Sequence, residues 1–138
     1  IFHWPEGNQA RGELRTTPGH VIDFAPTVLD IIGAKAPTSW KGDAIPSMPG
    51  RSLLASVKQD TTIERDLLWW MHDGHRAVRV DNWKLVADEG QPWELYNLDT
   101  DRAESNDLSK ARPEKARELE RAWERQLNAM IKTVSKSD

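Results

Sequence analysis

The chain has 138 residues, a length that fits one domain of ordinary size. Its 19 basic and 22 acidic residues are intermixed, so it lacks the basic surface of a nucleic-acid-binding protein. It contains no cysteine, which excludes a disulfide framework and thiolate metal sites. Its apolar runs are far shorter than the roughly 18 residues of a membrane span. We therefore expect neither nucleic acid nor membrane as a partner.

The first third of the chain predicts one strand and one helix. Ile1–Trp4 reads as a strand stopped by proline, and because a natural N-terminus rarely begins in mid-strand, we expect a piece of a longer protein. Residues 6–19 are predicted to form a loop. Asp23 is expected to cap a helix that ends at Gly33, and the proline-rich residues 34–51 are expected to form a long loop.

The middle of the chain predicts an antiparallel β-meander of about four strands, near residues 67–71, 75–80, 83–87 and 93–98. The run from Leu67 to Met71 is continuously apolar, which predicts burial on both faces. Asp73-Gly74 predicts a type I′ hairpin turn, because both central positions of that turn need positive φ.

A terminal helix is predicted from Pro113, which suits the first helical position. An apolar stripe at three- and four-residue steps predicts the face that packs on the sheet: Ala116, Leu119, Trp123, Leu127 and Met130. The tail from Thr133 to Asp138 is polar and expected to be frayed.

Three tryptophans lie close to the ends of the predicted strands: Trp70, Trp83 and Trp93. Cross-strand packing in the core explains such positions. An exposed aromatic platform for sugars explains them as well, and both interpretations stay open.

The candidate binding residues gather at the predicted hairpin tip: His72, Asp73, His75 and Arg76. His72 and His75 flank the turn, so they should lie across from one another on one face. Two ligands on a hairpin tip are too few for a metal site, which leaves a pocket-lining role or an incidental exposed pair. Arg76 can pair with Asp73 or Asp81 as surface electrostatics. The chain shows no P-loop, dinucleotide turn, zinc helix or nucleophile elbow, and we assign no catalytic or metal-binding residue within it.

Six segments together resemble the C-terminal third of sulfatases. The first matches a His-x-x-Asp-hydrophobic-x-Pro-Thr stretch leading into a helix that ends at glycine, the second a Gly-Arg-Ser-Leu-Leu segment, and the others the C-terminal meander of arylsulfatases. In chain order they are His20–Gly33, Gly50–Leu54, Trp70–Arg79, Trp83–Val86, Glu94–Leu98 and Glu104–Leu108. Each is weak alone, but six in order are specific. At the hairpin the likeness supports His72 more than His75.

The resemblance implies an alkaline-phosphatase-like α/β fold for the parent protein. Residues 1–54 would be the closing strand, helix and loop of its catalytic domain, and residues 55–65 a linker. Residues 66–138 would be an α+β subdomain, an antiparallel sheet backed by the long helix. The missing N-terminal catalytic domain would then be the partner of this chain. The family also favours a periplasmic or secreted location.

The resemblance further implies hydrolysis of sulfate esters by a formylglycine nucleophile beside a calcium ion, with a sulfated small molecule or glycan as substrate. Those groups would lie upstream of this chain, so the chain alone should be inactive. Ser47–Arg51 matches the family's Cys/Ser-x-Pro-x-Arg nucleophile pattern, but it falls in the proline-rich loop rather than at the start of a helix, and we interpret it as a linker. A related phosphoester or phosphonate hydrolase and a stand-alone binding module remain as alternatives.

Overall fold

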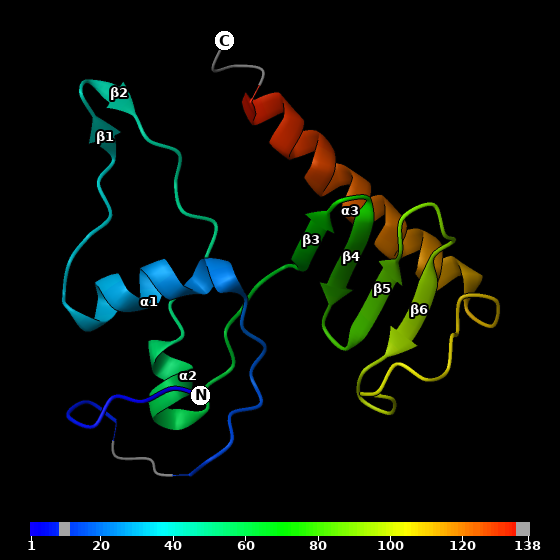
Figure 1. Cartoon of the computed structure of the whole chain (residues 1–138), viewed down its shortest axis with the longest axis horizontal. Coiled ribbons are helices and arrows are strands. Elements are labelled where there is room, and N and C mark those ends of the chain that lie inside the picture. The colour runs from blue at the N-terminus through cyan, green and yellow to red at the C-terminus, as the bar shows by residue number, and fades with distance from the viewer. Residues whose placement is uncertain (9–11, 135–138) are drawn as a thin grey trace. The chain divides into compact units, whose positions relative to one another are not determined.

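The computed structural model describes residues 1–8 and 12–134. The chain divides into two compact units, Ile1–Glu64 and Arg65–Asp138, and the division falls within the segment predicted to be a linker. Unit 1 carries short helices and a small hairpin, whereas unit 2 carries a sheet and one long helix (Figure 1).

Unit 1 is built around a 3₁₀ turn, η1 (Val21–Asp23), that runs directly into helix α1 (Phe24–Ile31). Gly33 follows the helix with a φ of 67°, and this left-handed residue ends the helix as the sequence predicts. Asp23 directly precedes α1, as the sequence predicts, but its side chain makes no capping hydrogen bond to this helix. His20 caps the 3₁₀ turn through its side chain, and the Asp23 side chain accepts the His20 N–H in return.

Three further predictions for unit 1 need correction. Residues 1–4 form no strand, and the chain turns at Trp4, whose carbonyl accepts the N–H groups of Gly7 and Asn8. A strand requires a partner, and no described segment pairs with these residues. The predicted loop 34–51 contains a small hairpin, β1 (Ser39–Trp40) with β2 (Asp43–Ala44). Helix α2 (Leu54–Gln59) occupies part of the predicted linker.

Polar groups join α1 to the segment that leads into α2. Asp23 is fully buried, and its carboxylate accepts the Arg51 N–H at 2.8 Å. Thr27 is also buried; its hydroxyl donates to the Asp23 carbonyl at 2.6 Å and accepts the Leu53 N–H at 2.8 Å. Because buried polar groups are stable only when hydrogen-bonded, these contacts specify how residues 51–53 lie on the helix.

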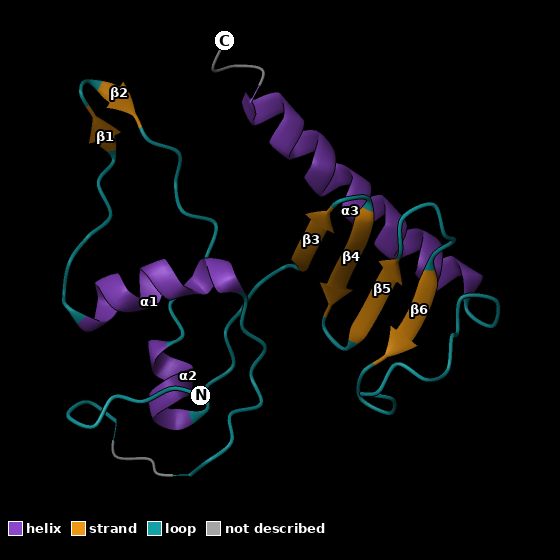
Figure 2. Ribbon diagram, viewed as in Figure 1, coloured by secondary structure: helices purple, strands orange, loops and turns teal. Residues whose placement is uncertain are grey.

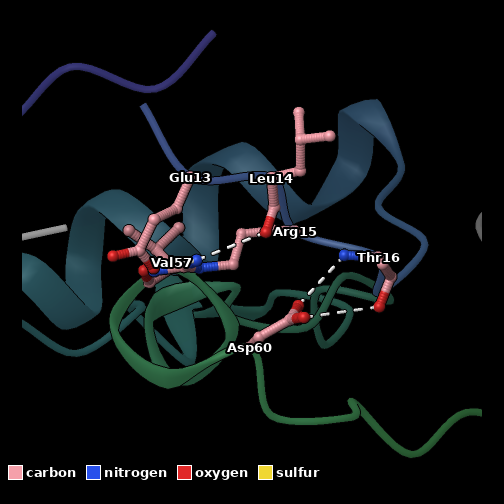
Figure 3. Close-up of polar contacts among 6 residues, drawn as sticks. All are labelled: Glu13, Leu14, Arg15, Thr16, Val57 and Asp60. Atoms are coloured by element: carbon pink, nitrogen blue, oxygen red, sulfur yellow. Dashed lines mark hydrogen bonds and ion pairs between the residues drawn. The ribbon is translucent and has the colours of Figure 1, made fainter. Parts of the chain in front are cut away.

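A second polar cluster fastens residues 13–16 to α2 (Figure 3). The Arg15 guanidinium donates to the Val57 carbonyl at 3.0 Å and to the Glu13 carboxylate at 2.8 Å. Asp60, which ends α2 in the left-handed conformation, accepts the Thr16 N–H at 3.0 Å. The segment is therefore held by side chains rather than by strand pairing.

Unit 2 contains the predicted meander, and this prediction is confirmed (Figure 2). Its four strands are antiparallel neighbours in chain order: β3 (Leu68–His72), β4 (His75–Val80), β5 (Trp83–Ala87) and β6 (Glu94–Asn97). Helix α3 (Pro113–Val134) covers one face of the sheet. The unit is therefore α+β, as expected. The predicted frayed tail is helical up to Val134, and its residues 135–138 lie outside the described part of the chain.

The core of unit 2 is a row of side chains that runs across the sheet. Val78 pairs with Leu85, and Leu85 pairs with Leu95, so the three lie side by side on one face, and none is exposed. Leu119 and Trp123 of α3 pack onto this row. The predicted helix stripe is confirmed for these two residues and for Ala116 and Leu127, which pack against the same core, but Met130 is 39% exposed.

Trp123 ties the helix to the edge of the sheet through its ring and its N–H. The ring stacks on Trp69 with centroids 5.6 Å apart and meets Trp93 edge-on at 5.7 Å. Its Nε1 donates to the Trp70 carbonyl at 3.1 Å, while the Trp69 Nε1 donates to the Trp123 carbonyl at 3.2 Å. Helix and edge strand thus exchange hydrogen bonds across an aromatic contact.

The prediction that β3 is buried on both faces is wrong. Leu68 is buried, but Trp70 and Met71 are 36% and 49% exposed. β3 is an edge strand, and α3 covers only the sheet face on which Trp69 lies. The apolar run therefore reflects two different environments: the strand begins in the core and ends at the surface.

The loop after β6 folds back on the sheet. Asp107 accepts the Leu95 N–H at 3.0 Å, so the loop supplies a hydrogen bond at the free edge of β6. On the sheet face away from α3, Lys84 lies opposite Tyr96 and donates to both oxygens of Glu104 at 2.6 and 2.7 Å. The Tyr96 hydroxyl donates to Glu94 at 2.6 Å. These contacts close the end of the sheet opposite to the β3 edge.

Candidate functional site

The candidate site lies at the tip of the β3–β4 hairpin. Asp73 and Gly74 form the turn with φ values of 46° and 80°, so both central residues have the positive φ that a type I′ turn requires. His72 and His75 are paired directly across the hairpin. The predicted turn and the predicted pairing of the two histidines are both confirmed.

The two imidazoles have different partners. The His72 side chain is 88% exposed, and its Nε2 lies 3.4 Å from an Asp73 oxygen. The His75 side chain is 57% exposed, and its Nδ1 lies 3.2 Å from an oxygen of Asp88, in the loop after β5. Both rings can therefore donate or accept a further hydrogen bond at the surface.

Arg76 is not held by Asp73 or Asp81, the partners that the sequence suggests. Its guanidinium lies over the Trp93 ring, with Cζ 4.5 Å from the ring centroid, and Nη2 donates to the Gln91 carbonyl at 3.2 Å. The planar guanidinium is well suited to stacking on an aromatic face. Arg76 thus anchors the loop before β6 to β4 and covers the edge of the core.

The hairpin separates these candidates onto two faces of the sheet. Side chains alternate along a strand, so His75 and Arg76 point to opposite faces. Arg76 shares the α3-facing side with Val78 and its stacking partner Trp93. His72 and His75 share the other face with Trp70. The structure therefore brings the two histidines together and places Arg76 elsewhere.

The loop 88–91 also reaches the hairpin tip, and the sequence analysis missed it. Asp88 contacts His75, and a Cβ on Gly74 would lie 2.7 Å from Cγ of Glu89. The predicted meander already implied this contact. β4 and β5 are antiparallel and Arg76 pairs with Ala87, so Asp88 must lie beside His75.

The histidines and carboxylates in the described part of the chain offer little to a metal ion. Among residues 1–8 and 12–134, no group of three or more histidine, aspartate or glutamate side chains could hold one. A calcium ion prefers six to eight oxygen ligands, and this donor set does not fit it.

Of the helices in the described part of the chain, none is both long and apolar enough to cross a membrane.

Ser47–Arg51, the segment that matches the nucleophile pattern, lies in an extended stretch of unit 1. Ser47 is exposed, and the next helix, α2, begins only at Leu54. The pentapeptide thus does not open a helix. Its Arg51 N–H instead binds the buried Asp23 carboxylate.

Comparison with known proteins identifies the family. The family model described as N-sulphoglucosamine sulphohydrolase, C-terminal, matches residues 1–133. The chain belongs to this sulfatase family. The resemblance to the C-terminal portion of sulfatases is therefore confirmed.

A curated relative of this sulfatase chain is a protein named sulfatase from Formosa agariphila. It is 30% identical over 129 residues, which cover 82% of this chain and 23% of the relative. The chain spans only 20–23% of the length of the curated relatives it matches.

Solved structures share the fold of this sulfatase chain. Ps i-CgsB, which has also been solved in complex with k-i-k-neocarrahexaose, superimposes with a TM-score of 0.69 at 24% identity, covering 90% of this chain and 27% of that one. BT4656, solved with its substrate D-glucosamine-2-N,6-O-disulfate, gives a TM-score of 0.55 at 22% identity, covering 77% and 23%. These likenesses concern the fold alone.

Proposed function

We propose that this chain is the C-terminal part of an arylsulfatase-like enzyme whose remaining portion hydrolyses sulfate esters. The observation that carries the proposal is the sulfatase family match over residues 1–133. A formylglycine nucleophile and calcium in the remaining portion would supply the attacking group and the stabilisation of the sulfate charge. Among the described residues, no group of side chains could hold the metal ion, and we propose that this chain contributes to binding.

The proposed substrate is a sulfated carbohydrate. Two fold neighbours support this choice, because they were solved with a carrageenan-type hexaose and with a sulfated glucosamine, respectively. A periplasmic or secreted location is proposed with it.

The proposed contribution of this chain is recognition by the hairpin tip. His72 is exposed at the turn and can donate a hydrogen bond to a sulfate oxygen or a sugar hydroxyl. Trp83 and Trp93 pack against the core of unit 2, so they are not available as a sugar platform. Trp70 is 36% exposed on the same face as His72, and it is the remaining candidate for stacking on a sugar ring.

The first test compares the 138-residue chain with the full-length parent protein. The parent should release sulfate from a sulfated glucosamine or a chromogenic aryl sulfate in the presence of calcium, and the chain alone should release none. Mass spectrometry of the parent should detect formylglycine. If the parent released phosphate from a phosphoester but no sulfate, it would be a phosphoester hydrolase instead. If the 138-residue chain alone hydrolysed a sulfate ester, the catalytic groups would not lie in the remaining portion of the parent.

The second test substitutes the hairpin in the parent enzyme. His72→Ala should raise KM or lower kcat/KM for the sulfated sugar while the thermal midpoint stays unchanged. His75→Ala should have a smaller effect, since Asp88 already engages that ring. Arg121→Ala, at an exposed position of α3, is the matched control. Wild-type kinetics for His72→Ala, or a loss of activity that follows a loss of stability, would make the hairpin structural.

A further inference from the structure

The sheet of unit 2 has an open face that carries charged side chains. Helix α3 packs on the other face, and it is the one helix among the described residues of unit 2, so the open face has no helix of this unit over it (Figure 2). Arg79 pairs with Lys84 across β4 and β5 and follows the buried Val78, so both cations lie on the open face. They lie at the end of the sheet opposite to the β3–β4 hairpin tip.

Lys84 has a counter-charge on this face, whereas Arg79 has none. The Lys84 ammonium donates to both oxygens of Glu104. The partly buried Arg79 donates from Nε to the Asp81 carbonyl at 2.8 Å, which is a neutral acceptor. Within the described part of the chain, no carboxylate pairs with the Arg79 guanidinium, and its two terminal nitrogens donate no hydrogen bond.

The loop after β6 brings a second cation to the same end of the sheet. Arg102 lies two residues before Glu104, which the Lys84 ammonium holds on the open face. Burial and the charge of Arg102 together lower the pKa of Arg79, so the two guanidiniums lie close enough to repel each other. Arg102 is exposed, and among the residues that the structure describes no acid pairs with it.

Two neighbouring guanidiniums without a carboxylate favour the binding of an anion. Arginine keeps its proton under all ordinary conditions, so neither side chain can relieve the repulsion by becoming neutral. Partial burial adds to the cost, because it removes hydration from the charged form. The planar guanidinium donates hydrogen bonds in pairs to oxyanions, which makes a group with several charged oxygens the best-suited ligand.

We propose that Arg79 and Arg102 form a subsite for a sulfate group of an oligosaccharide, distinct from the sulfate that the parent hydrolyses. This inference rests on the proposed function and adds a second contact to the proposed sulfated substrate. His75 and Arg79 are four residues apart on β4, a span of about 14 Å. Trp70 pairs with Ala77, so it lies between them on the same face. A chain of several sugars can contact both ends of this face, whereas a single sugar is too short.

Binding of a sulfated carrageenan-type hexaose to the full-length parent provides the first test, measured by calorimetry beside the same hexaose after desulfation. Arg102→Ala should raise the Kd of the sulfated hexaose about threefold to fivefold, because exposed ion pairs contribute modestly. Arg79→Ala combined with Arg102→Ala should raise it about tenfold. Both differences should disappear at a salt concentration of about 1 M, which screens exposed charges. The desulfated hexaose should bind all variants alike.

Arg121→Ala is the matched control, because it removes the same charge from an exposed position of α3. It should bind the sulfated hexaose like the wild type. Arg79 also holds the turn after β4, so Arg102→Ala, which loses no contact within the chain, decides the outcome if the double variant unfolds. The proposal is wrong if Arg102→Ala binds like the wild type, if Arg121→Ala is weakened equally, or if the wild type binds no sulfated hexaose.

Protection of arginine from phenylglyoxal locates the ligand in the unsubstituted parent. With the sulfated hexaose at about ten times its Kd, Arg79 and Arg102 should react about tenfold more slowly, as read by peptide mass spectrometry. Arg121 should react at the same rate with and without the hexaose. Unchanged reaction of Arg102 in the presence of the hexaose would overturn the subsite.

The two proposals fail in different ways. A parent that binds the sulfated hexaose through Arg79 and Arg102 but releases no sulfate would refute the function and leave the subsite intact. A parent that releases sulfate while Arg102→Ala binds the sulfated hexaose like the wild type would refute the subsite alone.

Discussion

Trp123 connects helix α3 to the sheet, so its removal should reveal how much of the stability of unit 2 depends on that contact. The ring is 8% exposed, stacks on Trp69, meets Trp93 edge-on and donates a hydrogen bond to the Trp70 carbonyl. Truncating a buried aromatic residue to alanine costs about 3–5 kcal/mol. Because two ring contacts and a hydrogen bond are lost together, we expect the upper part of that range.

The expected loss is large compared with the stability of the unit. A unit of this size has a free energy of unfolding of about 4–11 kcal/mol, so Trp123→Ala should leave it marginally folded. With a urea dependence of about 1–2 kcal/mol per molar, the midpoint should fall by about 2–4 M. The measurement is urea denaturation of the 138-residue chain, followed by circular dichroism at the helical band.

Two further variants show how much of the loss comes from the hydrogen bond of Trp123 and how much would follow from any substitution on this helix. Trp123→Phe keeps an aromatic ring on Trp69 but loses the hydrogen bond to Trp70, and it should cost about 1–2 kcal/mol. Met130→Ala, on the exposed end of the same helix, should change stability by less than about 0.5 kcal/mol. If Trp123→Ala behaves like Met130→Ala, the helix does not depend on this contact and the reasoning is wrong.

Three other measurements test local features of unit 2. Tyr96 is the single tyrosine of the chain, and its hydrogen bond to Glu94, its burial and the nearby carboxylates raise its pKa. Absorbance titration should therefore show that the phenol ionises above the ordinary pKa of 10.0, and Glu94→Gln should lower the pKa of Tyr96. Burial opposes the charged form of Asp107, but its hydrogen bonds and the nearby Lys110 outweigh burial and lower its pKa. As the pH falls, the carboxylate therefore takes up its proton at a higher pH in the unfolded chain than in the folded one. Unfolding free energy should therefore decline as pH falls below about 3.9, and less steeply in Asp107→Asn. Gly74→Ala should destabilise the hairpin by about 1–2 kcal/mol, because the residue has a φ of 80° and the new Cβ would contact Glu89; unchanged stability would contradict this geometry.

The features that sequence reasoning found in unit 2 depend on local chemistry. Asp73-Gly74 specifies its turn because few residues accept positive φ, and alternation along each strand follows from backbone geometry. Leu119 and Trp123 were identifiable because helical spacing places them on one side. The pairing of His72 with His75 followed from the turn alone.

The errors concern residues whose environment is supplied by distant parts of the chain. Asp23 has the chemistry of a helix cap, but its carboxylate is buried and accepts the Arg51 N–H, a partner 28 residues away. Arg76 has nearby aspartates in the sequence, yet it stacks on Trp93, which only the sheet register brings close. The apolar composition of β3 could not show that its end is exposed, because burial depends on which face α3 covers.

The sequence by itself determined the family, the meander and its turns, because motif order, glycine chemistry and side-chain periodicity are local properties. Only the tertiary structure decided which side of each element is buried. It placed Arg76 and the two histidines on opposite faces of the sheet. It also turned the apolar side of α1 outward, because the hydrogen bonds of Asp23 and Thr27 hold the polar side of that helix against residues 51–53.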